Sequence, residues 1–156
     1  MPKEKPRTHI IYSCHESRAP REFSRELANR IGVPSFDPQE YDPSDLGASN
    51  DLILVVDGKT HAPPSDFMPL WDHLKDQHPD LSHLKYSIFS TGSSSKVGSN
   101  VFAKRLDEQL QRCKANRRLI YLGDTMSGDI QHQFEDFSTA LIDQFEGRQR
   151  KDEDMF

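Results

Sequence analysis

Short apolar runs alternate along the chain with segments of helical periodicity. The runs predict strands near residues 8–13, 33–36, 51–56, 85–91 and 118–123. The third run, DLILVVD, is apolar on both faces, which is typical of a central strand in a parallel sheet. The second run is short and lies among prolines, which favours an edge strand.

Apolar residues spaced by three or four positions predict helices after the first, third, fourth and fifth runs. We expect the first helix to begin at Pro20, because proline suits a first turn, and to end at Gly32. The apolar residues that mark these helices are Phe23, Leu27 and Ile31; Phe67, Leu70, Trp71 and Leu74; Phe102, Leu106, Leu110 and Cys113; and Ile130, Phe134, Phe137, Leu141 and Phe145.

This order of elements predicts a doubly wound α/β sheet with helices on both faces. In such folds ligands bind at the carboxyl ends of the strands. We expect the domain to cover residues 8–145. Flexible, charged tails are expected at residues 1–7 and 146–156.

Composition narrows the class of protein. A chain of 156 residues with 34% hydrophobic and 29% charged residues is long enough for one globular domain. The net charge of −5 argues against nucleic acid as a partner. No apolar run approaches the ~20 residues needed to span a membrane. Two distant cysteines, Cys14 and Cys113, fit reduced thiols, so we expect a soluble cytoplasmic domain.

The stretch YSCHESRAPREF follows the first predicted strand and leads into the first helix. Cys14, His15 and Glu16 are adjacent and point in different directions, so we expect no metal site here. A cysteine-dependent phosphatase would use Cys14 as its nucleophile in a C-x5-R loop. Here Pro20 takes the arginine position and Arg21 comes one residue late. A structural role for Cys14 at the strand end is the alternative.

Three further segments resemble the FMN-binding domain of the diflavin reductase family, closest to the NADPH-dependent diflavin oxidoreductases. IFSTGSSSKVGSNVFAKRLDEQL, at 88–110, resembles the G-L-G-D-S-S-Y, F-N and K-x-L-D segment of that family. VVDGKTHAPPSDFMPLW, at 55–71, is similar to its T-T-G-x-G-x-P-P-D-N loop, and LIYLGDTMSGDIQHQFEDF, at 119–137, resembles its L-G-D-D motif. The resemblance implies a flavodoxin-like fold with five parallel strands in the order 2-1-3-4-5.

The resemblance also implies FMN as the cofactor and identifies the positions of its site. In the phosphate loop S/T-x-T-G-x-T/A, His15 replaces the first hydroxyl residue, Arg18 stands at the glycine, and only Ser17 keeps its character. Asn100 is also a candidate helix cap. The family positions that correspond to the cofactor site are Ser17, Arg18, Gly58, Thr60, Gly92, Ser94, Asn100, Gly123 and Asp124.

The ring-binding loops are altered as well. Lys59 and His61 replace the two glycines near the flavin ring, and Lys96 stands where the family has a stacking tyrosine. These changes predict a degraded FMN site and a non-catalytic interaction or structural module. The alternative is an FMN-binding electron-transfer domain that works with a separate FAD/NADPH reductase.

Charged surface residues suggest where a protein partner would bind. Glu26 and Arg30 interleave acid and base on the first helix as an i,i+4 pair, which favours a solvated face. Acidic residues follow the second strand and form a rim that either docks a reductase or another redox partner or serves solubility alone. The acidic rim consists of Asp37, Glu40, Asp42 and Asp45.

Overall fold

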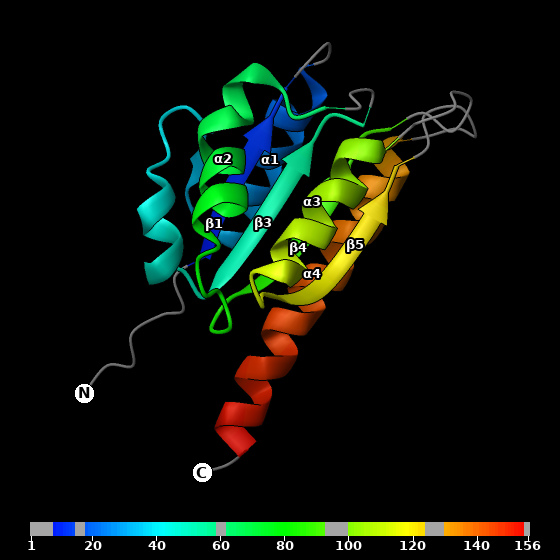
Figure 1. The fold of residues 1–156 in the computed structure, drawn as a ribbon. Coiled ribbons are helices and arrows are strands. Elements are labelled where there is room, and N and C mark those ends of the chain that lie inside the picture. The colour runs from blue at the N-terminus through cyan, green and yellow to red at the C-terminus, as the bar shows by residue number, and fades with distance from the viewer. Residues whose placement is uncertain (1–7, 15–17, 59–61, 93–99, 124–129, 155–156) are drawn as a thin grey trace.

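A computed structural model describes residues 8–14, 18–58, 62–92, 100–123 and 130–154, with side chains up to residue 146. Parallel strands in this part of the chain form one sheet in the order β2-β1-β3-β4-β5 (Figure 1), which confirms the predicted flavodoxin-like topology. The strands are β1 (Thr8–Ser13), β2 (Ser35–Phe36), β3 (Asp51–Val56), β4 (Lys85–Ser90) and β5 (Asn116–Leu122).

Helices cover both faces of the sheet, with α2 and α3 on one face and α1 and α4 on the other (Figure 1). The described residues also form two short 3-10 helices, η1 (Pro43–Ala48) and η2 (Ser65–Phe67), which the apolar pattern of the sequence did not predict. The α-helices are α1 (Ala19–Ile31), α2 (Met68–Gln77), α3 (Val101–Arg112) and α4 (Ile130–Asp154).

Strand β3 separates the two apolar cores. Every residue of β3 is buried, as expected for a central strand that helices cover on both faces. Leu54 packs in the core under α2 and α3, and Val55 packs in the core under α1 and α4. In the second core, the rings of Phe23 and Phe134 stack with centroids 4.5 Å apart and so join α1 to α4.

Helix α1 has nearly the predicted ends, whereas helix α4 is longer than predicted. Helix α1 begins at Ala19, so Pro20 lies in its first turn, and it ends at Gly32 with φ at 78°. Glycine has no Cβ and adopts this left-handed conformation readily, which confirms the predicted stop. Helix α4 continues to Asp154 and runs beyond the sheet (Figure 1), so most of the segment predicted as a C-terminal tail is helical. The N-terminal tail lies outside the described residues.

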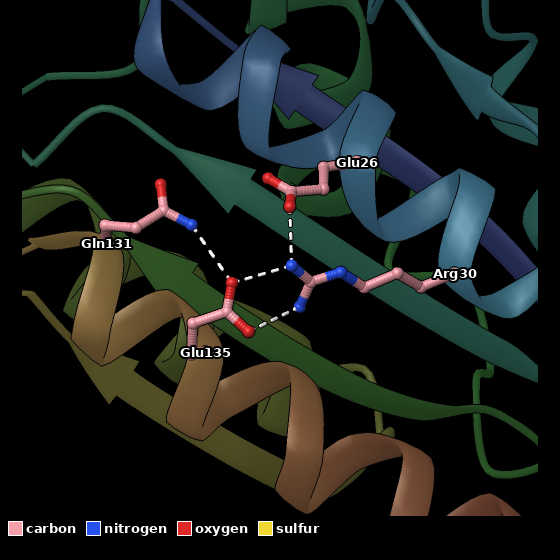
Figure 2. A network of polar contacts seen from close by, with 4 residues as sticks. All are labelled: Glu26, Arg30, Gln131 and Glu135. Atoms are coloured by element: carbon pink, nitrogen blue, oxygen red, sulfur yellow. Dashed lines mark hydrogen bonds and ion pairs between the residues drawn. The ribbon is translucent and has the colours of Figure 1, made fainter.

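A polar network on the surface ties α1 to α4 (Figure 2). The Arg30 guanidinium donates to both carboxylate oxygens of Glu135, at 2.8 and 2.6 Å, and to Oε1 of Glu26 at 2.5 Å. Gln131 donates to the same Glu135 carboxylate at 3.1 Å. The predicted Glu26–Arg30 pair is therefore confirmed, and the link between helices is an addition. Because these side chains are partly exposed, we expect a modest contribution to stability.

A buried ion pair lies near the amino ends of strands β3 and β5. The register between β4 and β5 passes from Tyr86–Arg117 to Ser87–Leu119, so Arg118 is an extra residue in β5. Its guanidinium donates twice to Oδ1 of Asp51 at the start of β3, at 2.9 and 3.1 Å. The side chains of Arg118 and Asp51 are only 8% and 3% exposed.

Among the described residues, no helix is both long enough and apolar enough to cross a membrane.

Candidate functional site

The candidate site lies at the carboxyl ends of the strands, where β1 and β3 are neighbours and the strand order reverses. Backbone hydrogen bonds continue just beyond the strands. The Asp57 N–H donates to the Ser13 carbonyl at 3.2 Å, the Thr91 N–H to Val56 at 3.0 Å, and the Gly123 N–H to the carbonyl of Ser90 at 2.6 Å. The bases of the four loops that leave β1, β3, β4 and β5 are therefore held together.

The structure places only part of the predicted FMN site. Gly58, Gly92, Asn100 and Gly123 lie together at the ends of β3, β4 and β5, whereas Arg18 lies at the N-terminus of α1. The predictions for the remaining positions fall outside the described residues: His15, Glu16, Ser17, Lys59, Thr60, His61, Ser94, Lys96 and Asp124.

Asn100 joins three loops through one residue. Its backbone N–H donates to the Gly58 carbonyl at 2.9 Å, and its Nδ2 donates to the Gly123 carbonyl at 3.2 Å. The Ser90 hydroxyl donates to Oδ1 of Asn100 at 2.6 Å, and Asn100 is 7% exposed. The residue occupies the N-cap position of α3 with φ at 63°, but its side chain makes no capping hydrogen bond. The predicted N-cap position is therefore confirmed, but the side chain bonds to groups in the neighbouring loops and not to the helix.

The three glycines around Asn100 are required by packing. A Cβ at Gly58 would come within 3.0 Å of backbone atoms of Gly92, and a Cβ at Gly92 would come equally close to the Asn100 side chain. A Cβ at Gly123 would come within 3.0 Å of the Ser90 carbonyl oxygen. Gly92, Asn100 and Gly123, which match the family pattern, therefore have a structural reason to be present whether or not a flavin binds, and packing requires Gly58 as well.

Asp66, in the middle of η2, contacts the end of β1 and was not among the predicted site residues. Its Oδ1 accepts a hydrogen bond from the Ser13 hydroxyl at 3.0 Å. Burial raises the pKa of Asp66, hydrogen bonds from Ser13 and the Cys14 backbone N–H oppose that shift, and the nearby Asp37 carboxylate adds to it. The position of Asp66 between the third strand and the following helix could have marked it as a site residue. Its contact with Ser13, 53 residues away in the chain, forms only when the chain folds.

The surroundings of Cys14 do not favour a nucleophilic thiolate. Burial is the main cause that raises the pKa of the Cys14 thiol, and the Asp66 and Asp57 carboxylates raise it further. A hydrogen bond from the backbone N–H of Arg21, together with the Arg21 charge, opposes the shift only in part. A phosphatase cysteine needs the opposite shift. The raised pKa, together with Pro20 at the position of the phosphatase arginine, therefore counts against the phosphatase alternative.

We predict that Cys14 reacts slowly with iodoacetamide near neutral pH. A raised pKa leaves less thiolate at that pH, so the alkylation rate should reach half its maximum above about pH 8.5, the value of an ordinary thiol. Alkylation rates against pH in a Cys113→Ser background, where Cys14 is the remaining thiol, check this. Half-maximal alkylation below pH 7, or aryl phosphate hydrolysis that disappears in Cys14→Ala, would contradict it.

The N-terminus of α1 corresponds to the phosphate-binding part of the family site. Arg18 is the N-cap residue and makes no side-chain capping hydrogen bond. Pro20 lies in the first turn and has no N–H, and the Glu22 N–H donates to the Arg18 carbonyl at 3.1 Å as the start of the helical ladder. An FMN phosphate needs several converging N–H and hydroxyl donors. The described residues do not fit that group.

Part of the acidic rim has a local structural role. The Asp37 carboxylate accepts from the Gln39 N–H at 2.9 Å, and the Asp42 carboxylate caps η1 by accepting from the Ser44 N–H at 3.0 Å. The latter hydrogen bond lowers the pKa of Asp42. Glu40 and Asp45 are exposed. The docking role of the rim stays a prediction.

No cluster of three or more potential metal-ligating side chains is found in the described part of the chain.

The fold and the loop arrangement define a flavodoxin-like α/β protein, and comparison with known proteins agrees. The family model for flavodoxin matches residues 20–143. The chain belongs to the flavodoxin family.

The chain is also similar to one module of larger reductases. It is 28% identical over 148 residues to NADPH–cytochrome P450 reductase of Oryctolagus cuniculus. The matched region covers 88% of this chain and 21% of the rabbit protein. It is 27% identical over 159 residues to the Homo sapiens protein, which covers 92% of this chain and 23% of the relative. The chain thus spans about a fifth of the length of these relatives. The resemblance to the FMN-binding domain of diflavin reductases is confirmed.

Solved flavodoxin structures share the fold at low sequence identity. A Streptococcus pneumoniae TIGR4 flavodoxin superposes with a TM-score of 0.70 at 13% identity, over 85% of this chain and 93% of its own. Oxidised flavodoxin 1 from Bacillus cereus superposes with a TM-score of 0.63 at 19% identity, over 87% and 96% of the two chains. These likenesses establish the fold alone.

Proposed function

We propose that this chain is a flavodoxin-fold module with a degraded FMN site, which acts as a non-catalytic interaction or structural module. The observation that carries the proposal is the N-terminus of α1. Arg18 stands there at the position of the family glycine, and Pro20 follows it without an N–H to donate. Among the described residues at this place, a dianionic phosphate therefore meets a side chain at the glycine position and one missing N–H donor.

The residues that still match the family do not weaken this proposal. Gly92 packs so closely against Asn100, and Gly123 against the Ser90 carbonyl, that any side chain would clash there. Selection for the fold is enough to retain them, and fold does not imply function. Their presence therefore supports the scaffold without requiring the cofactor.

The expected loss of FMN affinity is the sum of losses at three separate contacts to the ligand. Arg18 affects the phosphate, Lys59 with His61 affects the ring edge, and Lys96 replaces a stacking ring. A loss of ~1.4 kcal/mol at each of these three places would weaken FMN binding about a thousandfold, since losses at separate contacts add. A cofactor held that weakly is lost during purification.

We predict that the purified protein is colourless and does not quench FMN fluorescence in a saturable way at micromolar FMN. The variant Arg18→Gly/Lys59→Gly/Lys96→Tyr should recover part of the affinity, because it restores one group at each altered place. Fluorescence titrations of both proteins against the same FMN solution make the comparison. Stoichiometric FMN in the unmodified chain would refute the degraded site.

Stoichiometric FMN in the unmodified chain would favour a second candidate function, an FMN-binding electron-transfer domain that works with a separate FAD/NADPH reductase. The observation in its favour is the match to NADPH–cytochrome P450 reductases over most of this chain. Flavin absorbance together with electron transfer from a reductase would distinguish it from the non-catalytic module.

For either function we propose a protein partner that docks on the acidic rim. Glu40, Asp42 and Asp45 are exposed, which leaves their charges available to a basic surface. The free thiols of Cys14 and Cys113 support a cytoplasmic location.

A further inference from the structure

We infer that His9 makes the attachment of one surface segment sensitive to protons. The segment comprises residues 37–49, between β2 and β3, and carries both η1 and the acidic rim. Protonation of the His9 ring removes an acceptor that two buried hydroxyls of the segment share, so a fall in pH favours detachment of the segment from β1. The inference deepens the proposed function, because the docking on the rim that pH would regulate rests on that proposal.

The His9 ring joins β1 to the segment at two points. Its Nδ1 atom lies 2.7 Å from the Tyr41 hydroxyl and 2.8 Å from the Ser49 hydroxyl. The rings of Tyr41 and Phe36 also pack edge-on against the His9 ring, each with its centroid 5.4 Å away. Tyr41 is 4% exposed and Ser49 is 0% exposed, so their hydroxyls have little access to water. These two hydroxyls therefore depend on partners within the protein.

The Nδ1 atom of His9 accepts a hydrogen bond only while the ring is neutral. With the proton on Nε2, the Nδ1 lone pair accepts from a hydroxyl, whereas a protonated ring donates at both nitrogens. Tyr41 keeps its own proton, since burial raises the pKa of its phenol to about 12. A protonated His9 therefore leaves buried hydroxyl protons without the acceptor that they have in the neutral form, which destabilises the attached segment.

The direction of the pH effect follows from this loss. In a detached segment His9 is exposed to water, where a histidine binds its proton with a pKa of about 6.5. The attached form disfavours the same proton, so the stabilisation by His9 is fully present above about pH 6.5 and is lost as the pH falls below it. If only the detached form binds the proton, the equilibrium constant for detachment rises about tenfold between pH 7.5 and 5.5.

Carboxylates near the contact act in the opposite direction, but weakly. The charges of Asp42 and Asp45 raise the pKa of the phenol that contacts His9, so the same charges would favour a protonated His9. Both side chains are exposed, and water screens their charges. Asp51, at the start of β3, is already paired with Arg118. The lost acceptor for buried hydroxyls therefore determines the sign.

Two further histidines act on the segment and also oppose the effect. The Nε2 atom of His83 donates to the Leu46 carbonyl at 3.2 Å, and protonation strengthens such a donor. His73 of α2 attracts the Asp42 carboxylate when it is protonated. Both contributions remain in a variant that changes His9 alone, so comparison with that variant isolates the contribution of His9.

The test compares hydrogen exchange of backbone amides in wild type and in His9→Asn at pH 7.5 and 5.5. The asparagine side chain offers an oxygen acceptor that does not titrate in this range. The amides of Tyr41 and Ser49 report detachment, because both donate to carbonyls within the segment at 3.2 Å and short isolated turns do not persist. The Gly32 amide at the end of α1 reports opening elsewhere. Opening constants follow after division by the exchange rates of an unfolded chain.

We expect the opening constants at Tyr41 and Ser49 to rise about tenfold more in wild type than in His9→Asn as the pH falls from 7.5 to 5.5. At Gly32 the two proteins should change alike. The matched control His132→Asn replaces an exposed histidine of α4 and should behave as wild type does. A difference of less than about threefold between wild type and His9→Asn, or an equal difference at Gly32, would overturn the inference.

A second variant covers the case in which His9→Asn does not fold. Tyr41→Phe/Ser49→Ala keeps His9 and removes both hydroxyls, so its protonated ring leaves no hydroxyl without an acceptor. The pH-dependent rise at positions 41 and 49 should be at least about threefold smaller than in wild type, and a smaller reduction in the folded variant would overturn the inference. Neither measurement uses FMN or a partner, so FMN binding decides the proposed function separately.

Discussion

An Arg118→Ala variant should lose about 3–5 kcal/mol of unfolding free energy, because it leaves the buried Asp51 carboxylate without the guanidinium that balances its charge. The two side chains are 8% and 3% exposed, and the arginine donates to Asp51 at 2.9 and 3.1 Å. The guanidinium also lies 5.1 Å from the ring centroid of Phe145, so α4 loses a contact too. Urea unfolding followed by circular dichroism measures the loss.

The neighbouring residue provides the control. Arg117 pairs with Asp107 at 3.0 Å, but the Arg117 side chain is 45% exposed. Asp107 also accepts from the Tyr86 hydroxyl at 2.5 Å, so it keeps a partner when Arg117 is removed. Arg117→Ala should therefore lose about 1 kcal/mol or less. Equal losses in the two variants would show that burial of the Arg118 pair is not what stabilises the sheet.

A Gly58→Ala variant should be destabilised by about 3 kcal/mol or more, the upper range for added atoms in a packed region. The new Cβ would come within 3.0 Å of Gly92 backbone atoms, which cannot move aside as a flexible side chain can. The loops after β3 and β4 would have to separate, and the Asn100 N–H would lose its 2.9 Å contact with the Gly58 carbonyl. Thermal unfolding gives the measurement.

Gly47→Ala is the matched control for this prediction. Gly47 lies in η1, and a Cβ there would have nothing within 4 Å. Its unfolding temperature should stay close to that of wild type. A mild effect at Gly58 would mean that the strand ends tolerate expansion and that the glycine is retained for another reason.

The fold was predictable because each element carries its own apolar pattern. The uninterrupted apolar run of β3 predicts burial on both faces, and Phe102, Leu106 and Leu110 predict the buried face of α3; all are buried. Gly32 ends α1 as predicted, since the left-handed stop is a local property of glycine. Local signals of this kind survive without knowledge of the partner elements.

The sequence predicted which positions form the site, but not which side chains contact one another there. Asn100 follows the cap pattern of a polar residue before a helix, yet its side chain bonds to Ser90 at the end of β4 and to Gly123 just after β5. The Arg118–Asp51 pair depends on an extra residue in β5, and the contact of Asp66 with Ser13 joins residues 53 apart in the chain. Such contacts follow from tertiary packing, which periodicity does not encode.

The measurement that most directly tests the degraded FMN site is thermal unfolding of the unmodified protein with and without excess FMN. A ligand present at a hundred times its Kd stabilises the native state by about 2.7 kcal/mol. For a domain of this size that corresponds to a rise in Tm of roughly 5–10 °C. We predict no change in Tm at FMN concentrations up to about 100 µM, with riboflavin giving the same result. A rise of several degrees with FMN but not with riboflavin would contradict the degraded FMN site and establish a working cofactor site.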